Sequence, residues 1–160
     1  MSRETKEQLA TDLIRLAREH EAANDAFDEV AARKLGVNRT DLKCLSIIEN
    51  EGPMTAGRLA ELTGLTSAAV TAILDRLERA GYARRVRAEQ DRRQVIVELT
   101  PLVAERGEPI WGPLGRDAQA AFARMSVEEL KSVIEFFRWG RDLNKRHIAR
   151  VQELRFDQDR

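Results

Sequence analysis

The chain has 160 residues, of which 42% are apolar, 34% charged and 5% aromatic, and its formal net charge is zero. This length and composition fit one domain, or one domain with an appended oligomerisation element, and they argue against a wholly disordered or polybasic protein. A zero total does not exclude nucleic-acid binding, because basic residues can gather locally.

The single cysteine excludes an internal disulfide and fits a reducing compartment. Two histidines and one cysteine offer little for a metal site, so we expect no metal and no cofactor. The N-terminus lacks the apolar segment of a signal peptide, and no run approaches the roughly 20 apolar residues of a membrane span. The sequence therefore predicts a soluble, cytoplasmic protein with no membrane partner.

The first predicted element is a long helix over residues 4–34. Leu9, Leu13 and Leu16 begin an apolar stripe at helical spacing, and Gly36 provides the stop signal. A small core cannot bury the whole stripe of so long a helix. The pattern therefore predicts packing against another long helix or another subunit.

Three shorter helices are predicted between Gly36 and Gly81. Each opens on a residue whose side-chain oxygen can cap helical N–H groups, and each closes at a glycine. The N-caps are Thr40 for the first helix, Thr55 for the second, and Thr66 or Ser67 for the third; the stops are Gly52, Gly64 and Gly81.

The apolar period then changes from that of a helix to that of a strand. Residues 82–86 and 95–99 alternate as strands do, and the polar, arginine-rich segment RAEQDRRQ joins them. The simplest interpretation is a hairpin with a charged tip.

The remainder of the chain is predicted to be helical. Thr100-Pro101 starts a helix, and Ser126 with Glu129 forms the capping box of a last helix over residues 127 to about 154. The glycines and prolines between them predict a kinked or broken helix at about 107–115.

The second and third short helices carry the pattern of a helix-turn-helix. Ala60, Gly64 and Val70 stand at relative positions 0, 4 and 10, where the motif needs a small residue, a turn glycine and a branched apolar residue. The second helix of such a motif enters the DNA major groove. The hairpin that follows makes the pattern a winged one.

Basic residues gather on the same segment. Arg76 to Arg93 contains seven arginines against three acids, a local balance of +4. Arginine can enter a narrow minor groove and can pair with phosphates or guanine edges. The alternative is a solvated basic hairpin that binds no ligand. Because the hairpin follows directly after a helix-turn-helix, DNA binding is the favoured interpretation.

Two strings, TAGRLAELTGLTSAAVTAILDRLERAGYARR and DRRQVIVELTP, resemble the winged-helix core of the MarR family of transcriptional regulators. The resemblance implies an obligate homodimer with interleaved terminal helices. It also implies that the protein binds a palindromic operator on double-stranded DNA, usually as a repressor. Repression in the family is often relieved by a small-molecule effector, commonly a phenolic acid. The wing tip departs from the family pattern because it has no Gly or Pro.

The expected fold is therefore mainly α with a small β-hairpin wing. Residues 1–38 are predicted to form an N-terminal dimerisation helix, residues 39–100 the winged helix-turn-helix domain, and residues 101–160 the C-terminal dimerisation helices.

The expected DNA contacts follow from the side chains left outside the apolar face of the third short helix. Hydroxyls can bond base edges or phosphates, alanine methyls can contact thymine methyls, and wing arginines can reach the minor groove, Arg93 first and then Arg92. The predicted contacts are Thr55, Thr66, Ser67, Ala68, Thr71, Ala72, Arg76, Arg87, Arg92 and Arg93.

Arg76 has two open interpretations. It resembles the family's helix arginine, which implies pairing with Asp91 to support the wing. A plain phosphate contact or a pair within its own helix is the other interpretation.

Other residues are weighed for an effector or a redox role. The resemblance implies an effector pocket between the long helices and the winged core. Its candidate residues are Arg18, His20, Phe27, Asn38 and Trp111, although ordinary packing is the simpler role of each. Cys44 lies among apolar residues, which favours a buried structural thiol over a redox sensor.

Other classes of function are weighed against DNA binding. No Ser-His-Asp order, phosphate-binding loop or HExxH spacing is present, so an enzyme is not expected. A winged-helix protein-interaction module is a further alternative, and a transcriptional activator or ligand-independent regulator competes with a repressor.

Overall fold

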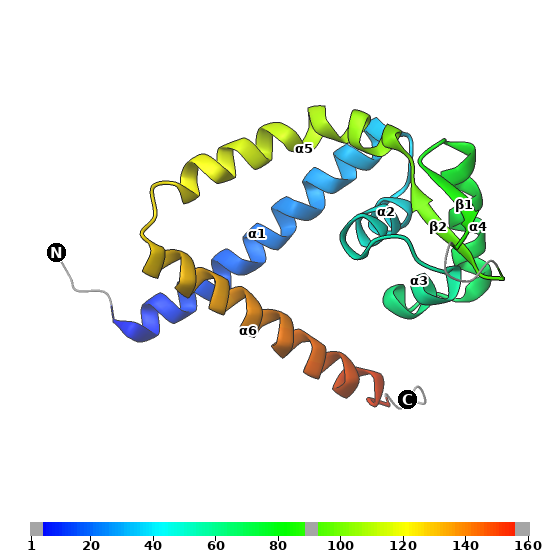
Figure 1. The fold of residues 1–160 in the computed structure, drawn as a ribbon. Coiled ribbons are helices and arrows are strands. Elements are labelled where there is room, and N and C mark those ends of the chain that lie inside the picture. The colour runs from blue at the N-terminus through cyan, green and yellow to red at the C-terminus, as the bar shows by residue number, and fades with distance from the viewer. Residues whose placement is uncertain (1–4, 89–92, 156–160) are drawn as a thin grey trace. The chain divides into compact units, whose positions relative to one another are not determined.

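A computed structural model describes residues 5–88 and 93–155, and within these residues the chain is mostly helical with one antiparallel hairpin (Figure 1). The expected fold class is confirmed. The elements are α1 (Lys6–Leu35), α2 (Arg39–Glu51), α3 (Ala56–Thr63), α4 (Ser67–Arg79), β1 (Ala83–Arg87), β2 (Val95–Leu99), α5 (Pro101–Phe122) and α6 (Val127–Gln152). The chain divides into two compact units, Met1–Ile110 and Trp111–Arg160.

Most helix ends lie where the capping residues and turn glycines of the sequence predicted them. Gly36 closes α1 with a left-handed φ of 71°, which a residue with a Cβ adopts only at a cost. Thr66, the first of the two candidates, caps α4 and accepts a hydrogen bond from the N–H of Ala69. Ser126 and Glu129 form the predicted capping box of α6.

The predicted cap of α2 is wrong. Asn38 is the N-cap, and its Oδ1 accepts a hydrogen bond from the N–H of Asp41 at 2.8 Å. Thr40 lies inside the helix. Asparagine is at least as good a cap as threonine, and the earlier cap lets α2 begin directly after the turn that closes α1.

The winged core packs α2, α3 and α4 against one another and against the hairpin (Figure 1). In the hairpin Ala83 pairs with Leu99 and Arg87 with Val95, and Met54 adds an isolated bridge to Val97. The predicted apolar face of α4 is confirmed, because all four of its members are buried: Val70, Ile73, Leu74 and Leu77.

Tyr82 joins three parts of the first unit. Its buried hydroxyl donates a hydrogen bond to the carbonyl oxygen of Leu35, at the end of α1, at 2.7 Å. Arg106 of α5 donates to the Tyr82 hydroxyl at 3.2 Å, and its guanidinium lies 5.7 Å from the ring centroid. The backbone N–H of Thr100 donates to the Tyr82 carbonyl. The residue thus links α1, the winged core and the start of α5.

Replacing Tyr82 with phenylalanine should lower the free energy of unfolding by about 1–3 kcal/mol, because it leaves the buried Leu35 carbonyl without its donor. Chemical denaturation would measure the change. Thr11→Val is the matched control, since it removes an exposed hydroxyl bonded to the Glu7 carbonyl and should change stability by less than about 0.5 kcal/mol. Equal midpoints for Tyr82→Phe and wild type would contradict this role.

Of the two outcomes predicted for 107–115, the break is wrong, because α5 is helical throughout that segment, and the kink stays a prediction. Each proline removes one backbone hydrogen bond from a helix, while the neighbouring bonds remain. Pro109 and Pro113 are four residues apart and fall on one face, so the losses are confined to one side of the helix. The boundary between the two compact units falls within this segment.

The long terminal helices leave apolar side chains exposed. In α1 only the last turns contribute to the core, through Ala31, Ala32 and Leu35. Leu13 is 48% exposed, and in α6, which has no buried residue among those described, Phe137 is 61% exposed. Exposed apolar stripes of this kind on long helices predict packing against a partner helix.

Candidate nucleic-acid interface

A helix-turn-helix lies at the centre of the candidate site. α3 ends at Gly64, whose φ of 71° turns the chain sharply into α4. The Thr63 hydroxyl donates to the Leu59 carbonyl at 2.7 Å and accepts from the Leu65 N–H at 3.3 Å, which holds the turn. The local sequence therefore folds as its spacing predicted.

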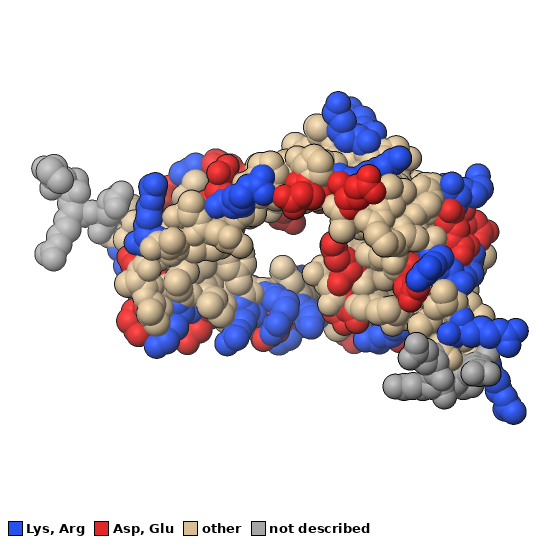
Figure 2. Space-filling view, turned by 45° about the horizontal axis from the view of Figure 1, so that its top comes forward, with Lys and Arg blue, Asp and Glu red and all other residues tan. Residues whose placement is uncertain are grey.

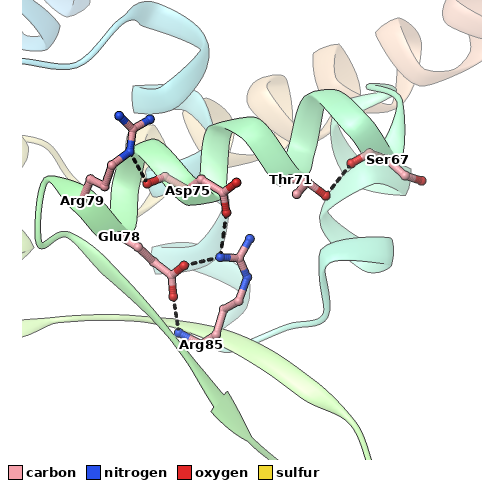
Figure 3. Close-up of polar contacts among 6 residues, drawn as sticks. All are labelled: Ser67, Thr71, Asp75, Glu78, Arg79 and Arg85. Carbon is pink, nitrogen blue, oxygen red and sulfur yellow. Dashed lines mark hydrogen bonds and ion pairs between the residues drawn. The ribbon is translucent and has the colours of Figure 1, made fainter.

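The outer face of α4 is exposed and carries small side chains. Ser67, Ala68, Thr71 and Ala72 are all exposed, on the side opposite the buried apolar face. The Thr71 hydroxyl donates to the Ser67 carbonyl at 2.9 Å (Figure 3) and can still accept a hydrogen bond from another group. This face can approach a DNA groove closely, because none of the four side chains is long.

The threonines at the helix starts have local partners. Thr55 accepts from the N–H of Arg58 at 3.1 Å, and Thr66 accepts from the N–H of Ala69 at 3.2 Å. Both side chains therefore act as helix caps. The first turns of α3 and α4 carry the partial positive charge on which our prediction of phosphate contacts rests.

Arg85 of β1 fastens the hairpin to α4 (Figure 3). Its Nη1 lies 2.9 Å from Asp75 Oδ1 and also pairs with Glu78, and its backbone N–H donates to Glu78 Oε1 at 2.8 Å. Arg79 donates from Nε to the Asp75 carbonyl at 3.1 Å. Sequence reasoning missed this cluster, because the only signal was the opposite charges of the residues that form it.

Arg76 pairs with a residue that sequence reasoning did not single out. Its guanidinium forms two hydrogen bonds with Asp41 of α2, Nε to Oδ2 at 3.0 Å and Nη2 to Oδ1 at 2.6 Å. The bond to Asp41 raises the pKa of Arg76 above its ordinary value. The predicted partner Asp91 lies outside the described residues, so the wing-support role of that residue stays a prediction.

The wing carries arginines with different surroundings. Arg84 pairs with Glu98 across the hairpin at 2.6 Å, and Arg84, Arg87 and Arg93 are all exposed. Arg92 lies outside the described residues.

The local charge of +4 is less concentrated than the sequence suggested, because at least three of the seven arginines pair with carboxylates. On the face seen in Figure 2, basic and acidic side chains lie beside one another.

Cys44 is buried, as predicted for a structural thiol. Burial raises its pKa, and the negative charge of Asp41 acts in the same direction. Both effects disfavour the thiolate, which is the reactive form of cysteine.

Two of the five candidate effector residues, His20 and Asn38, have local roles in the structure. The Asn24 amide lies 3.2 Å from His20 Nε2 within α1, and Asn38 is the cap of α2. Arg18 and Phe27 also lie on α1, and Trp111 is half-buried at the start of the second unit. An effector site at these residues stays a prediction.

Comparison with known proteins decides the family. Residues 37–95, which span the winged core, match the model of the MarR family. Over 154 residues the chain is 32% identical to YcgE of Bacillus subtilis, an uncharacterized HTH-type transcriptional regulator, and the match covers 95% of this chain and 99% of YcgE.

The chain belongs to the MarR family. Another relative, the B. subtilis regulator YfiV, is 37% identical over 106 residues, covering 64% of each protein. A MarR family protein from Bacillus stearothermophilus has the same fold, with a TM-score of 0.61 at 23% identity, covering 91% of this chain and 99% of that structure. Wild-type MarR from E. coli matches with a TM-score of 0.55 at 24% identity, covering 79% and 93%.

Membership makes this MarR-family chain a DNA-binding transcriptional regulator with a winged helix-turn-helix. It also confirms that the chain is a regulator and not an enzyme. Among the described residues, no helix combines the length and apolarity that a membrane span requires.

Proposed function

We propose that this MarR-family regulator is a homodimeric repressor that binds a palindromic operator and is released by a small aromatic acid. The observation that carries the proposal is the exposed, small-residue face of α4 beside a hairpin with exposed arginines. Such a face suits the major groove, and the hairpin suits the adjacent minor groove.

Base recognition is assigned to the outer face of α4. The hydroxyls of Ser67 and Thr71 can bond base edges, and the methyl groups of Ala68 and Ala72 can contact thymine methyls. Thr55 and Thr66 are assigned to phosphates, because each stands at a helix N-terminus whose backbone N–H groups attract anions.

The wing is assigned to the minor groove. Arg93, with Arg92 as the second candidate, supplies the side chain that enters it, and Arg87 contacts the backbone phosphates. Arg76 contributes chiefly by fixing α4 through Asp41, and its remaining exposed surface can face a phosphate.

Dimerisation is assigned to the long terminal helices. The exposed stripes of α1 and α6 need a partner, and a second copy supplies matching stripes under two-fold symmetry. The two recognition helices then lie about one DNA turn apart, roughly 34 Å, which demands a palindromic operator. Arg18, His20, Phe27, Asn38 and Trp111 are the candidates for the effector site.

Selection of bound duplexes from a random DNA library tests the proposal, together with sedimentation of the free protein. We expect the selected duplex to be palindromic, to bind far more tightly than random DNA, and to be bound by a dimer. A monomer, or a pool without enrichment, would contradict it. Fluorescence anisotropy on the selected duplex then screens aromatic acids for release, with an aliphatic acid of equal charge as the control.

Replacing Arg93 with alanine should weaken operator binding and reduce the salt dependence of the affinity by about one counterion, because one phosphate-neutralising charge is lost. Anisotropy titrations at several salt concentrations measure both quantities. Arg124→Ala removes the same charge from the exposed turn between α5 and α6, so it should leave the slope unchanged. An unchanged slope and affinity for Arg93→Ala would remove Arg93 from the interface.

A further inference from the structure

Arg85 stands out among the wing arginines because it faces the recognition helix. Its side chain is 30% exposed and contacts two carboxylates of α4, those of Asp75 and Glu78 (Figure 3). Its backbone N–H donates to the same Glu78 carboxylate. β1 is therefore attached to α4 at this residue by both main chain and side chain.

The neighbouring residue shows that this arrangement is specific to one face of the strand. Arg84 points to the other face of β1 and pairs with Glu98, its cross-strand partner in β2, so it stays within the hairpin. Its contact holds the two strands together, whereas that of Arg85 holds the hairpin against the helix. Arg84 and Arg85 carry the same charge, but Arg84 connects the two strands and Arg85 connects the hairpin to α4.

Surface ion pairs add little to stability as a rule, so stability alone does not account for this cluster. Arg85 Nη1 contacts both carboxylates, and Glu78 also accepts a hydrogen bond from the Arg85 backbone N–H, so side chain and main chain both attach the strand to the helix. The base of the wing is thus held at a defined angle to α4. Two elements that enter neighbouring grooves need such a fixed angle, because rigid DNA offers both grooves in one geometry.

We propose that Arg85 is a positioning residue that holds the wing against α4 so that wing and recognition helix engage DNA together. The proposal rests on the assignment of the wing to the minor groove. Because two carboxylates neutralise its guanidinium, Arg85 acts through the wing and not as a phosphate contact.

A double-mutant cycle between Arg85→Met and Arg93→Ala tests the proposal on the selected operator. If Arg85 positions the wing, the loss caused by Arg93→Ala shrinks by about fivefold or more in the Arg85→Met background. The matched control is Arg84→Met, which removes the same charge from the same strand and should leave the effect of Arg93→Ala unchanged. Additive losses for Arg85→Met would overturn the proposal.

Glu78→Gln separates positioning from simple electrostatics. It breaks the cluster from the helix side and removes a negative charge, so an electrostatic role predicts tighter DNA binding. Positioning predicts weaker operator binding, while the affinity for random DNA does not fall. Tighter operator binding by Glu78→Gln would overturn the proposal.

Failure of the wing assignment gives a different pattern. If Arg93→Ala has no effect in the wild-type background, the proposed minor-groove contact of that residue is wrong. Glu78→Gln then decides the role of Arg85 by itself: weaker operator binding supports positioning, and unchanged or tighter binding overturns it. Circular dichroism melting of each variant confirms that the winged core is folded.

Discussion

Replacing Arg76 with methionine is expected to lower the free energy of unfolding by about 3 kcal/mol, far more than the loss of an ordinary surface arginine. Asp41 is buried at 2% exposure, and Arg76 supplies two hydrogen bonds to its carboxylate. Without the arginine, a buried carboxylate loses its charged partner, which costs several times what an exposed pair contributes. Urea denaturation followed by circular dichroism measures the change.

The neighbouring Arg79 provides the matched control. Arg79→Met removes the same charge from the next turn of α4, where the guanidinium donates to the Asp75 carbonyl, and should cost less than about 0.5 kcal/mol. Asp41→Asn in the Arg76→Met background should recover part of the loss, because the buried group is then neutral. A loss for Arg76→Met no larger than that for Arg79→Met would contradict the structural role of the pair.

Placing aspartate at Phe137 is expected to convert the protein to a monomer and to weaken operator binding by about 100-fold or more. Phe137 lies in an aromatic group on α6, with its ring centroid 5.9 Å from that of Phe136, which in turn lies 6.0 Å from Trp139. A carboxylate there would have to be buried in the proposed dimer interface. A monomer holds one half-site, so it also loses the gain from simultaneous binding of both.

Sedimentation velocity and anisotropy on the selected operator measure the two effects. Ala149→Asp adds the same charge to the charged face of α6, beside Asp142 and Arg146, and should leave both the dimer and its affinity unchanged. A Phe137→Asp protein that stays dimeric and binds the operator would remove α6 from the dimer interface. The exposed stripe of α1 would then be the remaining candidate.

Much of the fold follows from short-range signals in the sequence. Caps, turn glycines and apolar spacing act within a few residues of one another, so Thr55, Gly64 and Ser126 were assigned correctly. The error at α2 arose because two good caps, Asn38 and Thr40, stand close together and compete. The error at α5 arose because proline signals a break locally, while the neighbouring helical bonds outweigh the loss.

By itself, then, the sequence determined that the protein has a helix-turn-helix, a wing and long terminal helices, and which face of α4 is buried. The partners of the arginines are known only from the folded chain, in which Arg76 pairs with Asp41, and Arg85 pairs with Asp75 and Glu78. Charged side chains in a sequence have many possible partners of opposite sign. Packing brings residues 35 positions apart within hydrogen-bond distance, as for Arg76 and Asp41, and no periodicity encodes that approach.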